Sequence, residues 1–194
     1  MAFYTNFNVN PTDAQVTGLT DSVELNNQAL RLERRGDFAG AELKHLEAIR
    51  VKEAGVGTDH ITTAVSYNGL GELYLKMEQL DKAEEYLNKA LRVREHLGPA
   101  SDLAVTRDDL GRLFEMKGEL QTAQEIRLNG APDNIACGNF SCSKLQNSLS
   151  NLSKCSVCKA VLYCSQSCQQ ADWKRHKKYC RRTQGGVSKE ISPL

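Results

Sequence analysis

Seven cysteines and one histidine recur at short intervals in the last third of the chain, and these are the side chains best suited to chemistry. Their order is Cys137-x4-Cys142-x12-Cys155-x2-Cys158-x5-Cys164-x3-Cys168-x7-His176-x3-Cys180. Thiolate and imidazole groups hold zinc tetrahedrally, and two ligands a few residues apart can bind the same ion. Eight such ligands are enough for two zinc ions, whereas an odd number of cysteines fits a disulfide framework poorly.

A zinc ion held in this way would be structural. Catalytic zinc keeps an open coordination position, usually beside three protein ligands, and eight ligands shared by two ions leave no position open. The metal would then contribute folding energy. A segment of about 50 residues with few large apolar side chains needs such a contribution, because it cannot build a sufficient hydrophobic core.

Charge divides the chain of 194 residues into two different parts. Residues 1–130 carry 15 Lys and Arg against 21 Asp and Glu, a net charge of −6, whereas residues 131–194 carry 10 against 3, a net charge of +7. The chain begins without the features of a signal peptide, and it has no apolar run of membrane-spanning length. We therefore expect an intracellular protein, in the cytoplasm or nucleus, where dense cysteine indicates metal rather than disulfides.

The acidic part contains three copies of one sequence pattern. The copies are LNNQALRLERRGDFAGAE from Leu25, YNGLGELYLKMEQLDKAE from Tyr67 and RDDLGRLFEMKGELQTAQ from Arg107, at offsets of 42 and 40 residues. Apolar residues recur at helical spacing in each copy. Two positions stay small in all three copies, and small residues let two helices approach closely. These positions hold Ala29, Gly71 and Gly111, and Ala41, Ala83 and Ala123.

Each copy is predicted to form two helices joined by a tight turn. Gly36 and Gly118 lie at the turn in the outer copies, and Glu78 takes the same place in the middle copy. Asp37 is placed to cap the second helix of its copy. In the third copy the second helix is predicted to be short, because Asn129, Gly130 and Pro132 follow it closely.

The small residues at the eighth and twentieth positions resemble those of the tetratricopeptide repeat (TPR), and the long period is similar to the kinesin light chain subtype. This resemblance implies a mostly α fold with a short TPR solenoid over residues 22–130, after a tail at 1–21. An open solenoid end exposes apolar surface, so we expect the cysteine-rich segment to cap it. In TPRs the first helix of each pair lines a concave face, which would hold Asn26, Leu30, Asn68, Glu72, Asp108 and Arg112.

The string from Cys155 to Cys180, with LYCSQSCQQADWKRHKKYC in it, closely resembles the MYND-type zinc finger. The resemblance implies a small two-zinc finger over residues 131–183, followed by a tail at 184–194. It also implies two interleaved sites, a pairing that spacing alone leaves open. Zinc 1 would be held by Cys137, Cys142, Cys164 and Cys168, and zinc 2 by Cys155, Cys158, His176 and Cys180.

MYND fingers as a family bind short proline-containing motifs, and the matching positions here are Ser156, Gln169 and Trp173. Trp173 is the one tryptophan of the chain, and two interpretations of it stay open. It could shield zinc from water as a lid, or it could form a flat wall for a peptide in the polyproline II shape. In the second case Gln169 could hydrogen-bond the peptide backbone.

No motif for catalysis occurs in the chain. There is no Gly-rich phosphate loop and no G-x-S-x-G, and the histidines at 45, 60 and 96 lie outside any catalytic constellation. MYND fingers and TPR-like helices also accompany SET-domain methyltransferases, but no SET-type string is present. We therefore predict a non-catalytic adaptor that binds proteins or proline-rich peptides. We expect no membrane contact, and the oligomeric state stays open.

The alternative function is regulation of transcription or chromatin through nucleic-acid contact by the basic run KRHKKYCRR. We favour protein binding, because no aromatic residues of the kind that stack on bases interleave this run. The lysines would also partly offset the negative charge of the zinc–thiolate clusters.

Overall fold

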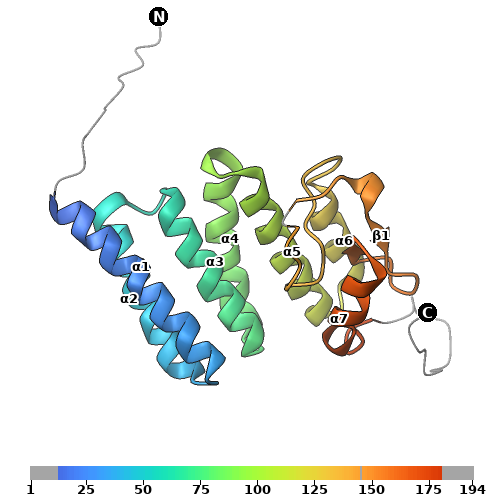
Figure 1. Ribbon diagram of the computed structural model, residues 1–194, viewed down its shortest axis with the longest axis horizontal. Helices are drawn as coiled ribbons and strands as arrows, with labels where there is room; N and C mark the ends of the chain where they lie inside the picture. The colour runs from blue at the N-terminus through green and yellow to red at the C-terminus, as the bar shows by residue number, and fades with distance from the viewer. Residues whose placement is uncertain (1–12, 145, 181–194) are drawn as a thin grey trace, which may run out of the picture.

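A computed structural model of the protein describes residues 13–144 and 146–180, with side chains from Thr20 onward. The repeat region consists of helices in pairs, and Figure 1 shows these pairs side by side, with the finger at the far end from the N-terminus. The helices are α1 (Asp13–Arg34), α2 (Phe38–Val56), α3 (Ile61–Lys76), α4 (Leu80–Leu97), α5 (Ala100–Lys117) and α6 (Leu120–Leu128). The finger adds the 3₁₀ helix η1 (Leu149–Asn151), strands β1 (Ser153–Lys154) and β2 (Leu162–Tyr163), and α7 (Gln166–His176).

The predicted solenoid of three helix pairs is confirmed, and two boundaries add detail. Helix α6 has 9 residues against 18 in α4, so the second helix of the last pair is short, as expected. Helix α1 begins at Asp13, inside the segment 1–21 that the sequence assigned to a tail. Each added helical residue gains a backbone hydrogen bond, so a helix can extend beyond its packed positions. The tails at 1–12 and 184–194 lie outside the described residues.

The three turns within the pairs share one backbone conformation. Gly36, Glu78 and Gly118 have φ angles of 80°, 58° and 83°, all in the left-handed region. In the middle turn the N–H of Gln79 donates to the carbonyl of Tyr74 at 2.9 Å, and the outer turns repeat this bond. This pattern ends a helix by satisfying its last carbonyls. The predicted turns are therefore confirmed, and so is the cap at Asp37, whose Oδ1 accepts from the N–H of Gly40 at 2.9 Å.

Of the three left-handed positions, Glu78 is the one that is not glycine, and a left-handed backbone is unfavourable for an L-residue. We expect Glu78→Gly to raise the free energy of unfolding by about 0.5–1 kcal/mol, after allowing for the extra unfolded-state entropy of glycine. Urea unfolding of the full chain measures this change. Glu78→Ala is the control, because it removes the side chain but keeps the strained backbone. Equal effects of the two substitutions would contradict the backbone explanation.

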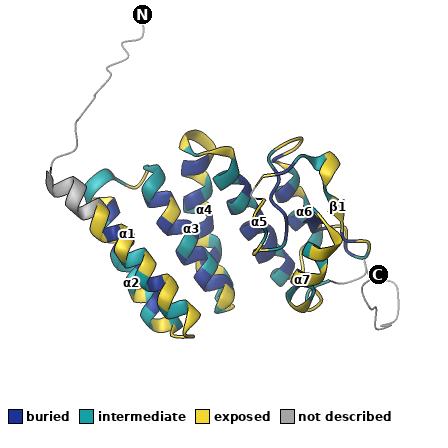
Figure 2. Ribbon diagram, in the orientation of Figure 1, coloured by how far each residue is buried: buried dark blue, intermediate teal, exposed yellow. Residues whose placement is uncertain are grey.

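Small residues permit close helix packing at both predicted positions. Ala41, Ala83 and Ala123 are 0% exposed. At Gly71 a Cβ atom would lie 2.7 Å from Cγ of Leu87, a distance that real contacts do not allow. Figure 2 shows the buried faces of the helices turned toward one another along the solenoid. The small residues therefore set the spacing of the helices.

The finger extends this core past the last helix pair. Ala123 of α6 packs in one buried cluster with Cys155, Val161 and Tyr163 of the finger, and Phe114 of α5 lies against the same cluster. The apolar end of the solenoid is thus covered by the cysteine-rich segment, as expected from the exposed end of an open solenoid.

At two equivalent positions of the repeat, the residues are apolar in the middle helix pair and polar in the two outer pairs. The middle pair of helices has Leu75 and Leu87 at these positions. The first carries Glu33 and His45, whose Oε1 and Nε2 atoms lie 3.1 Å apart with side chains 5% and 2% exposed. The third carries Glu115 and Arg127, which form a buried ion pair. At Gly111 a Cβ atom would lie 2.5 Å from Cζ of Arg127, so glycine there makes room for the guanidinium.

Three of the six side chains expected on the concave face are buried. Asn68, Asp108 and Arg112 are 3%, 3% and 8% exposed. The amide of Asn68 donates to carboxylate oxygens of Glu72 and Asp109 at 2.7 and 3.0 Å. Polar groups removed from water at a helix contact must bond one another, so these three side chains are held by contacts within the protein. Leu30 remains 42% exposed.

Candidate metal centres

The central part of the finger is a short β-hairpin whose turn holds two cysteines. Strands β1 and β2 are antiparallel, with Lys154 opposite Leu162. Between them the N–H of Cys155 donates to the carbonyl of Val161 at 2.8 Å, and the N–H of Lys159 donates to the carbonyl of Cys155 at 3.0 Å. This tight turn places Cys155 and Cys158 next to each other.

Helix α7 positions two further ligands. Its N-cap Ser165 follows Cys164 directly, and Oγ of Ser165 accepts from the N–H of Cys168 at 3.2 Å. The helix ends at His176. The N–H of Cys180 still donates to the carbonyl of His176 at 2.9 Å. One helical turn therefore keeps these two residues together beyond the end of α7.

The eight predicted ligands lie in two groups, within each of which all ligand atoms are within 4.8 Å of one another. We call them cluster 1 and cluster 2. Cluster 1 consists of Cys137, Cys142, Cys164 and Cys168, and cluster 2 of Cys155, Cys158, His176 and Cys180. This grouping is the interleaved one that the MYND resemblance implies.

The spacing within both clusters fits a tetrahedral zinc ion. With Zn–S of about 2.3 Å and Zn–N of about 2.0–2.1 Å, a tetrahedron has S–S edges of about 3.8 Å and S–N edges of about 3.5 Å. In cluster 1 the sulfur of Cys164 lies 3.6 Å from those of Cys142 and Cys168. In cluster 2, Cys155 Sγ lies 3.7 Å from Cys180 Sγ, and Cys158 Sγ lies 3.4 Å from His176 Nε2.

Neighbouring donors favour the thiolate forms that metals bind. The N–H of Cys164 donates to the sulfur of Cys137 at 3.5 Å, and the N–H of Lys144 donates to that of Cys142 at 3.4 Å. A hydrogen bond from the Asn139 side chain lowers the pKa of Cys168 to about 7. Hydrogen bonding to a charged form lowers its free energy, so these two backbone donors oppose the burial that raises the pKa values of Cys137 and Cys142.

The second ring nitrogen of His176 faces a carboxylate from the repeat region. Nδ1 of His176 lies 3.0 Å from Oε2 of Glu115 on α5, and both side chains are 0% exposed. Glu115 belongs to none of the metal-ligand or peptide-binding motifs of the sequence. The signal that could have found it is a charged residue at a repeat position where the middle copy has Leu75.

Glu115 belongs to a buried ionic network that joins the repeats to the finger. Arg127 of α6 is 1% exposed and donates to Oδ1 of Asp108 at 2.7 Å, to the finger carbonyl of Ala160 at 3.0 Å and to Glu115. From the finger, Arg175 donates to Glu115 at 3.2 Å. Burial alone would raise the pKa of Glu115, but Arg127, His176 and Arg175 outweigh burial and hold that pKa below its usual value. Glu115 is therefore ionised.

The predicted peptide-binding residues are accessible to different degrees. Ser156 is exposed in the hairpin turn, and Gln169 and Trp173 are half-buried, one turn apart on α7. The ring of Trp173 meets that of His176 edge-on, with centroids 6.0 Å apart. This contact supports the interpretation that Trp173 shields zinc from water as a lid. The partial exposure of its indole is also compatible with a flat wall for a bound peptide.

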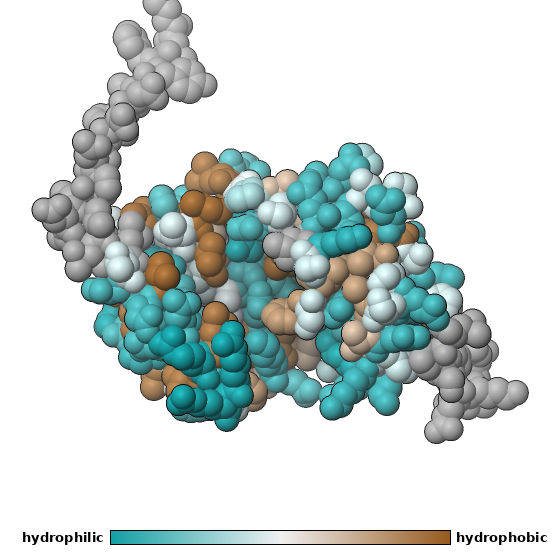
Figure 3. Space-filling view, viewed as in Figure 1, coloured by the Kyte–Doolittle hydropathy of each residue, from teal (hydrophilic) through white to brown (hydrophobic). Residues whose placement is uncertain are grey.

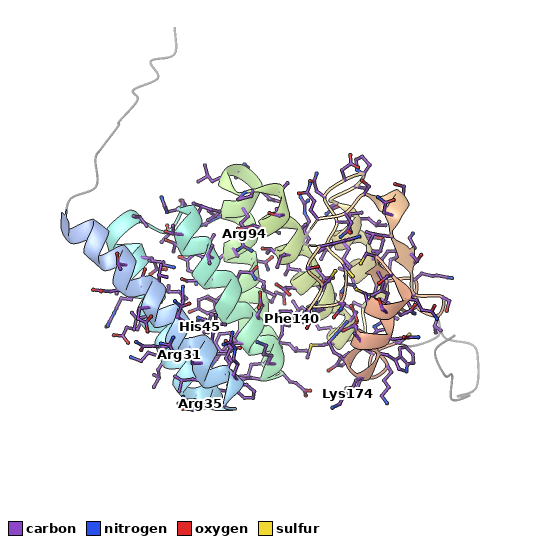
Figure 4. The ribbon with its side chains drawn as sticks, viewed as in Figure 1. Arg31, Arg35, His45, Arg94, Phe140 and Lys174 are labelled. Atoms are coloured by element: carbon purple, nitrogen blue, oxygen red, sulfur yellow. The ribbon has the colours of Figure 1, made fainter. Side chains whose placement is uncertain are left out.

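The basic residues of α7 are divided between solvent and the interior. Lys174, Lys177 and Lys178 are exposed, and Figure 4 shows Lys174 on the finger, away from Phe140. Arg175 instead donates to Asp172 at 2.6 Å as well as to Glu115. Arg181 and Arg182 of the basic run lie outside the described residues.

A cavity of about 280 Å³, which we call the junction cavity, lies between the repeats and the finger. Its apolar wall includes Leu75, Met116 and Phe140, and Arg112 and Tyr179 also line it. Phe140 is 57% exposed, with the guanidinium of Arg112 5.2 Å from its ring centre. Figure 4 shows Phe140 between the repeat helices and the finger, and Figure 3 shows hydrophobic colouring over this junction.

None of the helices in the described part of the chain has the length and apolar character needed to cross a membrane.

Comparison with curated proteins finds short similarities to much longer chains. The chain is 50% identical over 40 residues to SET domain-containing protein 14 of Caenorhabditis elegans, which is 21% of this chain and 9% of that protein. It is 52% identical over 31 residues to histone-lysine N-methyltransferase ASHR1 of Arabidopsis thaliana, 16% of this chain and 6% of that protein. It is 41% identical over 44 residues to MYND-type zinc finger protein MUB1 of Saccharomyces cerevisiae, 23% of this chain and 7% of that protein. The chain thus matches less than a tenth of each of these relatives.

Structure and family comparisons cover more of the chain. The crystal structure of BtubC (BKLC) from P. vanneervenii has a TM-score of 0.54 and 27% sequence identity, over 56% of this chain and 44% of that chain. The family model for the tetratricopeptide repeat matches residues 23–96 and 62–126, and that for the MYND finger matches residues 137–180. The repeat matches span more than half of the sequence, and the chain therefore belongs to the tetratricopeptide-repeat proteins and carries a MYND finger after its repeats.

Proposed function

We propose that the chain is a non-catalytic adaptor that uses two structural zinc ions to build a peptide-binding finger on the end of its repeats. TPR and MYND domains are protein-interaction modules. The observation that carries the proposal is that each cluster gathers four ligand atoms within 4.8 Å of one another. Four protein ligands complete a tetrahedral zinc site, so no position remains for a substrate or an activated water.

Cluster 1 would hold its zinc with four thiolates, and cluster 2 with three thiolates and Nε2 of His176. Bound zinc would supply folding energy to the finger. The protein residues then shape the surface, because the hairpin turn presents Ser156 while α7 presents Gln169 and Trp173. Proline-rich segments are preformed in the polyproline II shape and dock on aromatic side chains, which reduces the entropy lost on binding.

The test is titration of proline-rich peptides into the zinc-loaded full chain. We expect Trp173→Ala to abolish binding while both zinc ions remain, because a wall residue can be removed without removing a ligand. Tryptophan is enriched among the few interface residues whose truncation costs about 2–4 kcal/mol, and a loss of that size would weaken binding by roughly 30-fold to 1,000-fold. Isothermal titration calorimetry measures binding, and metal analysis of the same sample measures zinc.

Phe140→Ala is the matched control, since it removes a half-exposed aromatic ring from the junction cavity and leaves the proposed peptide site intact. Peptide binding should be unchanged by it. Loss of binding in Phe140→Ala and not in Trp173→Ala would move the site to the junction cavity. Loss of zinc together with binding in Trp173→Ala would show that this residue serves only as a lid.

Regulation through nucleic acid is the second candidate, supported by the exposure of Lys174, Lys177 and Lys178. Binding of this kind releases counterions, so its affinity falls steeply as salt rises. Peptide affinity on an aromatic wall should change little over the same range. Titrations of an RNA or DNA duplex and of the peptide at two salt concentrations distinguish the two functions.

A further inference from the structure

The residue of greatest interest outside the ligand sets is Glu115, because it belongs to the repeats and yet contacts a ligand of the finger. Nε2 of His176 faces the sulfur of Cys158 at 3.4 Å, so Nε2 is the nitrogen directed at the metal. Nδ1 lies on the other side of the ring, 3.0 Å from Oε2 of Glu115. If Nε2 binds zinc, Nδ1 keeps the ring proton and its N–H donates a hydrogen bond to the Glu115 carboxylate.

We propose that Glu115 is a positioning residue for cluster 2, so that the repeat region sets how tightly the finger holds its second zinc. A histidine ligand that donates its other N–H to a carboxylate is fixed in orientation and tautomer, and it becomes a stronger donor to the metal. This inference rests on the proposed zinc in cluster 2.

The surroundings of Glu115 keep its carboxylate in place and ionised. Its Oε1 accepts from Arg127 and its Oε2 from Arg175 at 3.2 Å. Arg127 in turn donates to Asp108 at 2.7 Å and to the carbonyl of Ala160 at 3.0 Å. Because Glu115 is 0% exposed, water does not compete for its oxygens, and the hydrogen bond to His176 acts at full strength.

The arrangement depends on the docking of the last repeat against the finger. The ring of His176, a candidate ligand of cluster 2, contacts a repeat carboxylate 61 residues earlier in the chain. Beside cluster 1, Arg112 of α5 donates at 3.2 Å to the carbonyl of Gly138, which is not a ligand atom. The two zinc sites therefore differ in a way that their ligand spacing does not reveal. The zinc affinity of cluster 2 is therefore coupled to the packing of α5 against the finger. A change that destabilises this packing should also lower the zinc affinity of cluster 2.

The experiment compares Glu115→Gln with the unsubstituted full chain after loading with cadmium-113. The four-sulfur and three-sulfur sites give separate NMR resonances, so each cluster is followed by itself during competition with a chelator. We expect Glu115→Gln to lower the metal affinity of cluster 2 about 10-fold to 100-fold and to leave cluster 1 unchanged. Glu119→Gln, an exposed residue at the N-cap of α6, is the control and should match the unsubstituted chain at both sites.

Two outcomes would overturn the proposal. One is unchanged affinity at cluster 2, and the other is equal weakening of both clusters, which would mean that Glu115 only supports the fold. If Glu115→Gln does not fold, a two-bond ¹H–¹⁵N NMR spectrum of the unsubstituted zinc-loaded chain provides the test, because it shows which ring nitrogen of His176 carries the proton. His176 should carry its proton on Nδ1, protected from exchange, and a proton on Nε2 would refute the proposal. An unsubstituted chain that takes no metal in cluster 2 would instead overturn the zinc assignment itself, and this inference with it.

Discussion

Removing zinc from the intact chain with a chelator should unfold residues 137–180 while the repeat helices remain. Structural zinc sites contribute about 10–16 kcal/mol of apparent binding energy near neutral pH, which exceeds the stability of most small domains. The repeats have a core of their own, including Leu70, Leu73 and Leu87, all 0% exposed. We expect the loaded chain to contain two zinc ions, measured by metal analysis, and far-UV circular dichroism to retain most of its helical signal after chelation.

The repeats should nevertheless melt at a lower temperature once the finger has unfolded. Ala123 and Phe114 pack against the cysteine-rich cluster, so loss of the finger exposes the apolar end of the solenoid. Removal of residues 131–194 should have the same effect, and returning zinc to the chelated chain should reverse it. A content of one zinc or none would contradict the two-site assignment. An unchanged melting temperature would show that the repeats and the finger are independent.

Arg127→Leu should have the second largest effect, destabilising the folded chain by about 3–5 kcal/mol in urea unfolding. Removing one partner of a buried ion pair leaves the other charge uncompensated, and Arg127 faces both Asp108 and Glu115 with its side chain 1% exposed. Leucine is the informative substitution, because Leu87 occupies the matching position of the middle repeat.

Two further variants separate charge from packing at this site. Arg92→Leu is the control, since the pair of Arg92 with Asp59 is 64% and 74% exposed and should contribute about 0–1 kcal/mol. Glu115→Leu combined with Arg127→Leu reproduces the leucine pair of the middle repeat, and it should be less destabilised than Arg127→Leu alone. A double variant at least as destabilised as Arg127→Leu alone would contradict the charge explanation.

The repeat pattern by itself determined the helices of this protein. Small residues and apolar spacing are local consequences of how one helix packs on the next, so three aligned copies predicted three helix pairs. Glycines at two turns, with Glu78 at the third, likewise predicted where the chain reverses. The eight candidate metal ligands could also be named from the sequence, because cysteine and histidine side chains at short intervals are the pattern that binds zinc.

Only the tertiary structure decided which buried polar residues meet across the junction. The sequence shows a glutamate at 115 and an arginine at 127 where the middle repeat has leucines, and that exchange signals a special environment. It does not name the partners, because His176 lies 61 residues from Glu115 and the carbonyl of Ala160 lies 33 residues from Arg127. Contacts of this range follow from how the finger docks on α5 and α6. Docking is set by shape and by the need to pair every buried charge, and neither appears as a local pattern.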